Sequence, residues 1–371
     1  MTTTSSLKQL LHDKTMPSAP ELVQDEGAGS VRCLACGHRC LIRPGKAGVC
    51  RVRLNQEGEL RVPGNYVAGL QVDPIEKKPF YHAYPGREAL SFGMLGCDLH
   101  CSYCQNWVTS QALRDDDAVS LPRFCSADEL VVMAIQQRAP VVVSTYNEPL
   151  ITADWAMQVF EKAADQGLAC GFVSNGNATP EVLDYLKPLV SLYKVDLKSF
   201  DDRKYRKLGA VLSNVLRTIK GLKERGFWVE IVTLVIPGFN DSDTELKQMA
   251  QFIAGVSEDI PWHVTAFHPD YKMNDTGRTP VKTLVRAYEI GKEAGLRFVY
   301  PGNIPGASDG FENTYCPSCE ALAIERNGFF VRKNTMKRGR CSSCDYAIPG
   351  VWEDRAPLES NGPGVPRPLS I

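Results

Sequence analysis

From about residue 89 to residue 310, short β-rich apolar runs alternate with segments whose apolar residues recur at helical spacing. The expected strands are residues 89–95, 141–145, 171–174, 192–197, 228–235, 262–267 and 297–300. The expected helices between them are residues 127–138, 153–166, 180–186, 211–225, 244–254 and 281–294. Such alternation predicts an α/β fold with a parallel sheet and right-handed crossovers. Six units favour a partial (β/α)6 barrel of the TIM type, with an open doubly wound sheet as the alternative.

The segments that flank this core have different patterns. Before the core, we expect a mobile arm over residues 1–28, with at most one short helix, and a small cysteine-rich module of loops and short strands over residues 29–88. After the core (residues 89–310), we expect a second cysteine-rich module over residues 311–352 and a disordered, Pro/Gly-rich tail over residues 353–371.

Charge and hydropathy narrow the class of protein. The 371 residues include 42 basic and 43 acidic side chains, so no global field favours nucleic acid or a membrane surface. The sequence has no 18-residue apolar stretch, and its first residues lack the apolar core of a signal peptide. We therefore expect a cytoplasmic protein without membrane contact.

The thirteen cysteines fall mostly into three groups with short gaps. The groups are Cys33, Cys36, Cys40 and Cys50; Cys97, Cys101 and Cys104; and Cys316, Cys319, Cys341 and Cys344. Only Cys125 and Cys170 stand apart. In a reducing compartment this clustering indicates metal ligation and not a disulfide framework.

The central group, Cys97, Cys101 and Cys104, has the spacing C-x3-C-x2-C and no local fourth cysteine. An iron–sulfur electron carrier normally has a cysteine on each iron of a [4Fe–4S] cube. A cube held by three cysteines has one iron free to take another ligand. The alternative is a zinc knuckle that borrows its fourth ligand from elsewhere.

Polar residues follow the ends of several expected strands. The carboxyl ends of parallel strands meet at one edge of a barrel, where barrel chemistry takes place. A charged pair that closes a buried strand is costly without a ligand or partner, which singles out Asp196 and Lys198. The other candidates are Asn147 and Glu148 after the second strand, Ser174 and Asn175 at the end of the third, and His268 after the sixth. Each has a simpler interpretation as a turn residue or a surface group.

The three-cysteine motif, with Tyr103 just before its last cysteine, resembles the signature of the radical S-adenosylmethionine (SAM) superfamily. Residues 195–198 (Val-Asp-Leu-Lys) and the Val-Ile-Pro-Gly turn at 235–238 resemble the pyruvate formate-lyase activating enzymes. The flanking cysteine groups and residues 146–149 (Tyr-Asn-Glu-Pro) resemble the radical SAM proteins of the AmmeMemoRadiSam system. The genes of that branch accompany those of Memo-like and AMMECR-type proteins.

This resemblance implies a [4Fe–4S] cluster on Cys97, Cys101 and Cys104, with SAM on the open iron. It places Tyr103 against the adenine. The residues that it implies for the methionine and ribose of SAM are Asn147, Glu148, Ser174, Asn175, Asp196, Lys198 and His268. The implied reaction is reductive cleavage of SAM to methionine and a 5′-deoxyadenosyl radical, which abstracts hydrogen from a substrate.

We therefore expect a radical SAM oxidoreductase whose substrate is a protein, in which it generates a glycyl radical or modifies a side chain. The electron donor would be a flavodoxin or ferredoxin, and Memo-like and AMMECR-type proteins are candidate partners. One alternative is an RNA-modifying radical SAM enzyme, against which the absence of a large basic stripe argues. Another is a non-enzymatic zinc or iron–sulfur interaction module.

The two flanking groups each offer four cysteines. The C-x2-C pairs Cys316/Cys319 and Cys341/Cys344 are typical of a zinc ribbon, with an auxiliary iron–sulfur cluster as the alternative. For Cys33, Cys36, Cys40 and Cys50 zinc and a second iron–sulfur cluster fit nearly equally, and we favour zinc.

Overall fold

A nine-stranded sheet is the centre of the computed structural model, which describes residues 7, 11–304, 310–354, 360 and 362–369. Its strand order is β16-β15-β14-β13-β12-β11-β9-β8-β20. The seven strands from β9 to β16 are parallel, and β8 and β20 extend the β9 edge in antiparallel fashion. The strands are β8 (Gly69–Pro74), β9 (Glu88–Gly93), β11 (Val141–Ser144), β12 (Ala169–Ser174), β13 (Val190–Asp196), β14 (Trp228–Val235), β15 (Trp262–Ala266), β16 (Val299–Gly302) and β20 (Arg367–Pro368).

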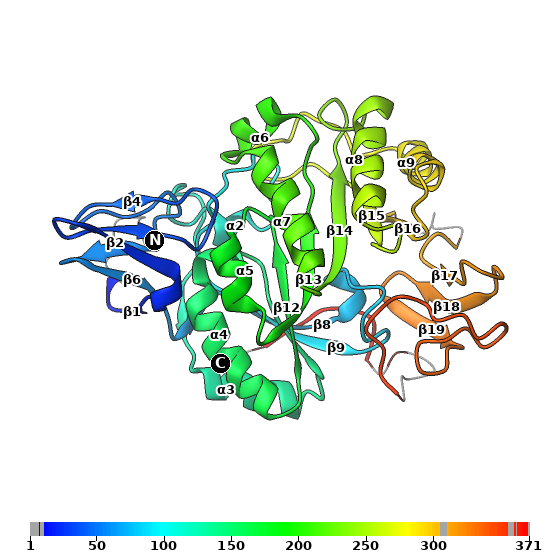
Figure 1. Cartoon of the computed structure of the whole chain (residues 1–371), viewed down its shortest axis with the longest axis horizontal. Coiled ribbons are helices and arrows are strands. Elements are labelled where there is room, and N and C mark those ends of the chain that lie inside the picture. The colour runs from blue at the N-terminus through cyan, green and yellow to red at the C-terminus, as the bar shows by residue number, and fades with distance from the viewer. Residues whose placement is uncertain (1–6, 8–10, 305–309, 355–359, 361, 370–371) are drawn as a thin grey trace.

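Helices connect the parallel strands and cover the outside of the sheet (Figure 1). They are α3 (Ala127–Gln136), α4 (Ala153–Asp165), α5 (Pro180–Leu186), α6 (Asp202–Leu208), α7 (Leu212–Glu224), α8 (Asp243–Val256) and α9 (Val281–Glu293). Local sequence sets where they begin: Ser126 and Glu129 form a capping box at α3, and Thr179 caps α5 directly before Pro180. The predicted six-unit α/β barrel is therefore confirmed.

The apolar side chains divide between two sides of the sheet. Leu90 and Phe92 of β9 pack outward against helix residues such as Trp155 and Phe160. Ala89, with Val141, Val143 and Leu192, packs with Ile75, Phe80 and Ala83 in a separate cluster. The segment that contains η2 (Ile75–Lys77) thus packs against strand residues distinct from those that the helices cover.

The N-terminal segment differs from our expectation. Instead of an arm with at most one short helix, residues 15–27 form β1 (Thr15–Pro17), η1 (Pro20–Leu22) and β2 (Val23–Gly27). These elements pair with later strands in two small sheets, β1-β6-β5 and β2-β3-β4. The remaining elements of this region are β3 (Ser30–Cys33), β4 (Leu41–Ile42), β5 (Leu54–Gln56), β6 (Glu59–Pro63), and β7 (Tyr66–Val67), which pairs with β10 (Arg123–Phe124).

The C-terminal cysteine region forms a third three-stranded sheet at the opposite end of the molecule (Figure 1). Its strands are β17 (Thr314–Tyr315), β18 (Leu322–Asn327) and β19 (Phe330–Asn334). The expected disordered tail contains a paired strand, since Arg367 of β20 pairs with Val72 of β8. Residues 355–359, 361 and 370–371 of that tail lie outside the described residues.

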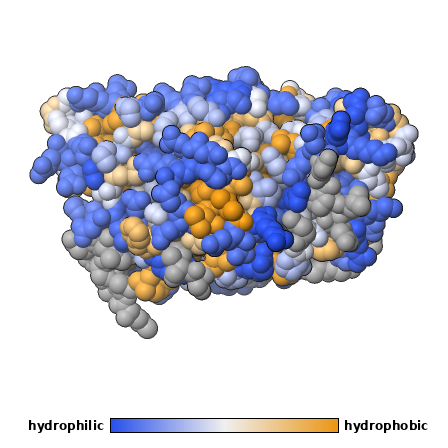
Figure 2. Space-filling model, turned by 90° about the horizontal axis from the view of Figure 1, so that it is seen from below, coloured by the Kyte–Doolittle hydropathy of each residue, from blue (hydrophilic) through white to orange (hydrophobic). Residues whose placement is uncertain are grey.

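Polar residues cover most of the face shown in Figure 2, and hydrophobic residues gather there in a limited central patch. Among the described helices, none combines the length and the apolar composition that a membrane span requires.

Candidate active site

The loop after β9 carries the three central cysteines to the carboxyl edge of the sheet. A β-carbon on Gly93 would lie 2.3 Å from the carbonyl oxygen of Thr145, so only glycine allows the ends of β9 and β11 to approach this closely. Cys101 is buried, whereas Cys97 and Cys104 are half-buried. The short helix α2 (Trp107–Ser110) follows the loop directly.

The surroundings of these thiols suit metal ligation. The Leu99 N–H donates to Cys97 Sγ at 3.3 Å, and Ser110 Oγ lies 3.1 Å from Cys104 Sγ. Burial raises the pKa of all three thiols, that of Cys101 to about 12, so without a cation they hold their protons. A coordinated metal displaces such protons.

The spacing of the sulfur atoms bears on the type of metal site. A single tetrahedral zinc with Zn–S bonds of about 2.3 Å holds its sulfurs about 3.8 Å apart. Among the described residues, Cys97, Cys101 and Cys104 do not form a group whose ligand atoms all lie within 4.8 Å of one another. Four irons require more room between the sulfurs than one zinc ion, so these residues fit a cluster better than a zinc knuckle.

Asp98, between two of the cysteines, is fully buried and joins the loop to the third strand end. Its Oδ1 accepts a hydrogen bond from Asn175 Nδ2 at 2.7 Å, and its Oδ2 accepts one from Asn177 Nδ2 at 2.9 Å. His38 Nε2 lies 3.8 Å from Asp98 Oδ2. Asp98 was not predicted as a site residue, since it is one acidic residue in a polar loop.

Glu148 connects the second strand end to the third. Its two carboxylate oxygens accept hydrogen bonds from Ser174 Oγ and the Asn175 N–H, both at 2.7 Å. Burial and the nearby Asp98 charge raise the pKa of Glu148 to about 8. The neighbouring Asn147 uses Oδ1 to accept from the Met94 N–H at 3.0 Å. These four predicted residues, Asn147, Glu148, Ser174 and Asn175, therefore hold strand ends together.

Asp196 ends β13 and lies between two lysines, Lys194 within the strand and Lys198 two residues beyond its end. Lys194 Nζ contacts Asp196 Oδ1, and Lys198 Nζ donates to Asp196 Oδ2 at 3.0 Å. Burial alone would raise the pKa of Asp196, but the two ammonium groups lower it to about 2. Asn240 donates to the Lys198 carbonyl oxygen at 2.9 Å and so fixes the backbone here. Lys194 stands two residues before Asp196, just as Lys198 stands two residues after it. This spacing in the sequence could have indicated Lys194 as a site residue.

Tyr103 and His268 both lie near the cysteine loop. Tyr103 is buried, with its ring 5.7 Å from that of Phe239, and its hydroxyl has no hydrogen-bond partner among the described residues. His268 is half-buried, and its Nε2 lies 3.0 Å from Nε2 of Gln105, the residue directly after Cys104. The structure thus brings His268 to the loop that contains Tyr103.

A buried polar cluster that the sequence did not predict centres on Tyr146, whose φ of 70° is unusual for tyrosine. The Tyr146 hydroxyl donates to Asp73 Oδ2 at 2.6 Å, and Lys78 Nζ lies 4.6 Å from the Tyr146 ring centroid. Asp73 belongs to β8, so this cluster ties that antiparallel strand to the strand end that carries Asn147 and Glu148.

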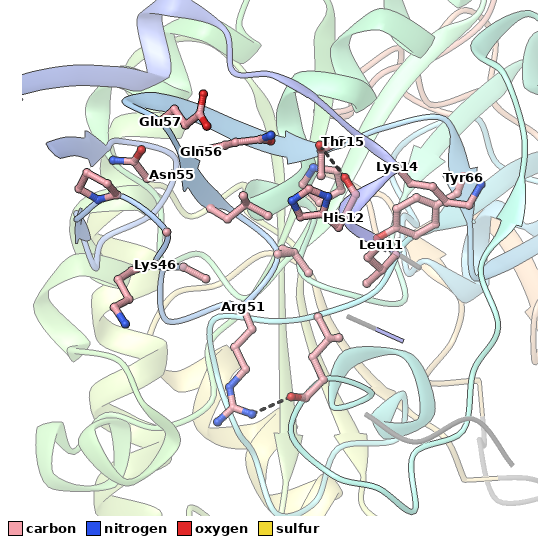
Figure 3. A pocket seen from close by; sticks show the side chains of 17 residues that line it. Leu11, His12, Lys14, Thr15, Lys46, Arg51, Asn55, Gln56, Glu57 and Tyr66 are labelled. Carbon is pink, nitrogen blue, oxygen red and sulfur yellow. Dashed lines mark hydrogen bonds between the residues drawn. The ribbon is translucent and has the colours of Figure 1, made fainter. Parts of the chain in front are cut away.

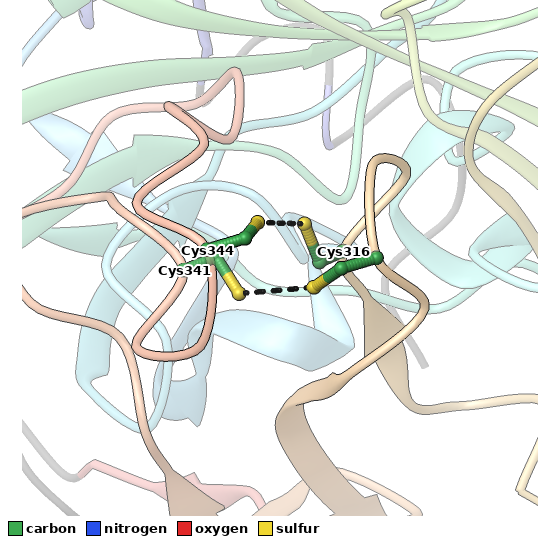
Figure 4. Close-up of side chains that lie close together, drawn as sticks. Cys316, Cys341 and Cys344 are labelled. Atoms are coloured by element: carbon green, nitrogen blue, oxygen red, sulfur yellow. Dashed lines mark hydrogen bonds between the residues drawn. The ribbon is translucent and has the colours of Figure 1, made fainter.

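The four C-terminal cysteines converge at the far end of the molecule (Figure 4). All four ligand sulfurs lie within 4.8 Å of one another. The Cys316 and Cys344 sulfurs are 3.6 Å apart, and those of Cys319 and Cys341 are 3.7 Å apart. This spacing is close to the value of about 3.8 Å that tetrahedral zinc requires.

The N-terminal sheets enclose a pocket of about 570 Å³ (Figure 3). Its lining includes Leu11, Lys14, Thr15, Asn55 and Tyr66, and none of the predicted site residues. Arg51 closes one side by donating to the Leu113 carbonyl oxygen at 2.7 Å.

Comparisons with known proteins indicate the family of this chain. Residues 93–253 match the description "Radical SAM superfamily". An uncharacterized protein of Methanocaldococcus jannaschii is 36% identical over 323 residues, which cover 86% of this chain and 95% of the relative. The pyruvate formate-lyase 1-activating enzyme of Escherichia coli is 22% identical over 236 residues, which cover 58% and 93% of the two chains.

A solved structure of a radical SAM methyltransferase from Sphaerobacter thermophilus aligns with a TM-score of 0.46 at 20% identity, covering 61% of this chain and 70% of that one. The sequence comparisons bear out the predicted superfamily and the homology to activating enzymes. This chain belongs to the radical SAM superfamily.

Proposed function

We propose that this enzyme cleaves SAM reductively at a [4Fe–4S] cluster on Cys97, Cys101 and Cys104. The single observation that carries the proposal is the arrangement of three buried or half-buried thiols without a fourth cysteine, beside the charged end of β13. A cluster held there would supply one electron to the sulfonium of SAM, whose C5′–S bond would break to give methionine and a 5′-deoxyadenosyl radical able to abstract hydrogen from the substrate.

The chain's own residues would bind and orient SAM. Asp196 is ionised between Lys194 and Lys198, so it offers a carboxylate to the amino or hydroxyl groups of SAM, and Lys198 offers a cation to the methionine carboxylate. Tyr103 offers a buried aromatic face for the adenine, and His268 a ring nitrogen at the open side of the loop.

The other predicted residues, Asn147, Glu148, Ser174 and Asn175, would hold the strand ends in place. Glu148 holds Ser174 and Asn175, and Asn147 holds the start of the cysteine loop. In this proposal they fix the ends of β11 and β12 against the loop, so that the polar groups there keep one arrangement when SAM binds.

We propose a protein as the substrate, with a low-potential flavodoxin or ferredoxin as the electron donor. Similarity to activating enzymes over 93% of the length of the Escherichia coli relative supports this class of substrate. Balanced charge gives less support to RNA. Memo-like and AMMECR-type proteins are the first partners to test, and zinc is the proposed metal of the C-terminal cysteines.

The experiment is an anaerobic assay of the reconstituted protein with dithionite and SAM, to which each candidate partner protein or total RNA is added in turn. We expect 5′-deoxyadenosine without any addition, and faster formation with one protein. Deuterium transfer from that labelled protein into 5′-deoxyadenosine would identify it as substrate. Stimulation and transfer by RNA alone would contradict the proposed substrate class.

A further inference from the structure

The N-terminal cysteines lie on two loops that face each other. Cys33 ends β3, and its backbone N–H donates to the Cys40 carbonyl oxygen at 2.9 Å, so the hairpin sets these two residues side by side. A β-carbon on Gly48 would lie 3.4 Å from Cys40 Sγ, which brings the second loop, with Cys50, against the first. Cys33, Cys36 and Cys50 are buried, and Cys40 is half-buried.

The sulfur atoms have hydrogen-bond donors around them. The Val49 N–H donates to Cys40 Sγ at 3.5 Å, and Arg53 Nη1 donates to Cys33 Sγ at 3.5 Å. Arg53 is itself buried and held by the Ile151 carbonyl oxygen and by Asp154. Such donors stabilise negative charge on sulfur, which a buried set of four thiolates requires.

The spacing of these sulfurs differs from that of the C-terminal set. All four C-terminal ligand atoms lie within 4.8 Å of one another, and no three of the N-terminal cysteines do so among the described residues. In this respect the N-terminal set resembles Cys97, Cys101 and Cys104, which hold the cluster in our functional proposal. One zinc ion would require sulfurs about 3.8 Å apart, so the spacing favours a cofactor with several metal ions.

The N-terminal loops also touch the loop of the central cysteines. A β-carbon on Gly96, directly before Cys97, would lie 3.3 Å from the Cys50 carbonyl oxygen. Gly37, directly after Cys36, donates its N–H to the Asn177 carbonyl oxygen at 2.7 Å. An open pocket of about 620 Å³ lies between the loops, lined by Gly48, Val49 and Arg51 on one side and by His100 and Arg114 on the other.

We propose that Cys33, Cys36, Cys40 and Cys50 hold a second iron–sulfur cluster next to the catalytic loop, in place of the zinc ion that we favoured from sequence. Four cysteines complete the ligand set of such a cluster, so it has no open iron for SAM. This inference concerns the metal content of the chain and does not depend on SAM cleavage, so either proposal can fail without the other.

The test is metal and sulfide analysis, with Mössbauer spectroscopy, of the anaerobically reconstituted full-length C97A/C101A/C104A variant. We expect iron and sulfide in equal amounts, about two per chain for [2Fe–2S] or about four for [4Fe–4S], together with about one zinc in the C-terminal site. Cys40→Ala, added to the triple variant, should remove this iron. Cys125→Ala, added in the same way, should not, because Cys125 is a buried thiol outside the three cysteine groups.

If the triple variant does not fold, the wild-type chain still decides the matter. More than about four irons per chain, with about one zinc, supports the second cluster. Iron content that is the same in the wild-type chain and in its Cys40→Ala variant, or a folded triple variant that holds no iron, overturns it, whether or not a second zinc ion is found.

Discussion

Asn175 donates a hydrogen bond from Nδ2 to Asp98 Oδ1 at 2.7 Å, which fastens the end of β12 to the loop between Cys97 and Cys101. Both residues are buried, and Asn175 Nδ2 also lies 4.0 Å from Cys97 Sγ. A cysteine loop with no regular structure of its own is thus held at a defined distance from the strand ends that we propose for SAM binding.

Replacing Asn175 by alanine should therefore loosen this loop. Asn175→Ala removes one of two asparagine donors to a buried carboxylate, which costs roughly 1–3 kcal/mol of unfolding free energy. Urea unfolding of the apo protein measures the loss, and iron analysis should show weaker cluster retention. The matched control is Asn274→Ala, because the hydrogen bond that the Asn274 side chain donates is exposed. Equal stability of the two variants would contradict a positioning role for Asn175.

Glu148 should make the stability of the apo protein depend on pH. Its pKa is about 8 in the folded chain and 4.5 ordinarily, so between these values the folded state binds more protons than the unfolded state. Stability from this group is therefore present at low pH and is lost as the pH rises toward about 8, by on the order of a few kcal/mol. The measurement is urea unfolding from pH 5 to about 8.

The matched variant for that measurement is Glu148→Gln, which does not titrate. We expect a smaller decrease in unfolding free energy over the same pH range than in the wild-type chain. An identical slope in both proteins would show that Glu148 is not the titrating group.

Asp196 should be needed for SAM binding. Asp196→Asn removes the charge between Lys194 and Lys198 and should weaken SAM binding at least about tenfold, equivalent to about 1.4 kcal/mol. Equilibrium dialysis with the cluster-loaded protein measures the affinity, and iron content shows that the cluster remains. Asp243→Asn, which affects an exposed ion pair with Arg286, should bind SAM normally. Normal binding by Asp196→Asn would remove β13 from the proposed SAM site.

The C-terminal cysteines should hold one metal ion independently of the catalytic loop. The Ser343 N–H lowers the pKa of Cys341 to about 6, so this thiol readily becomes a thiolate ligand. Cys341→Ala should lose about one zinc per chain and expose the C-terminal module to proteolysis, while the catalytic iron is retained. Ser342→Ala should keep the metal. Unchanged zinc in Cys341→Ala would place the ion elsewhere.

The sequence predicted the parallel core closely because each β/α unit has a strong local pattern. The predicted helix at 180–186 coincides with α5 (Pro180–Leu186), and the other predicted core helices differ only at their ends. The pattern did not place β8 in the central sheet, and it missed β20, which has only two residues and pairs with β8 across most of the chain. Strands β1 and β2 fall where an arm was expected, whereas the short strands expected over residues 29–88 are present.

A motif at a strand end singled out Asp196 and Lys198, which the structure places together in an ion pair, and their role in SAM binding stays a prediction. Site prediction missed residues whose role depends on a distant partner. Asp98 becomes informative only once Asn175 and Asn177 lie beside it, and Asp73 only once Tyr146 does. The metal that the N-terminal group would bind likewise depends on the distances between its sulfur atoms in space. The intervals between these cysteines along the sequence do not determine those distances.

The most direct test of the central claim is 5′-deoxyadenosine formation by the reduced, reconstituted wild-type chain and its Cys101→Ala variant, with Cys125→Ala as the control thiol. We predict product with wild type and Cys125→Ala, and none with Cys101→Ala, which should also lose about four irons per chain. Continued SAM cleavage by Cys101→Ala, or no cleavage by the iron-loaded wild type, would contradict the account.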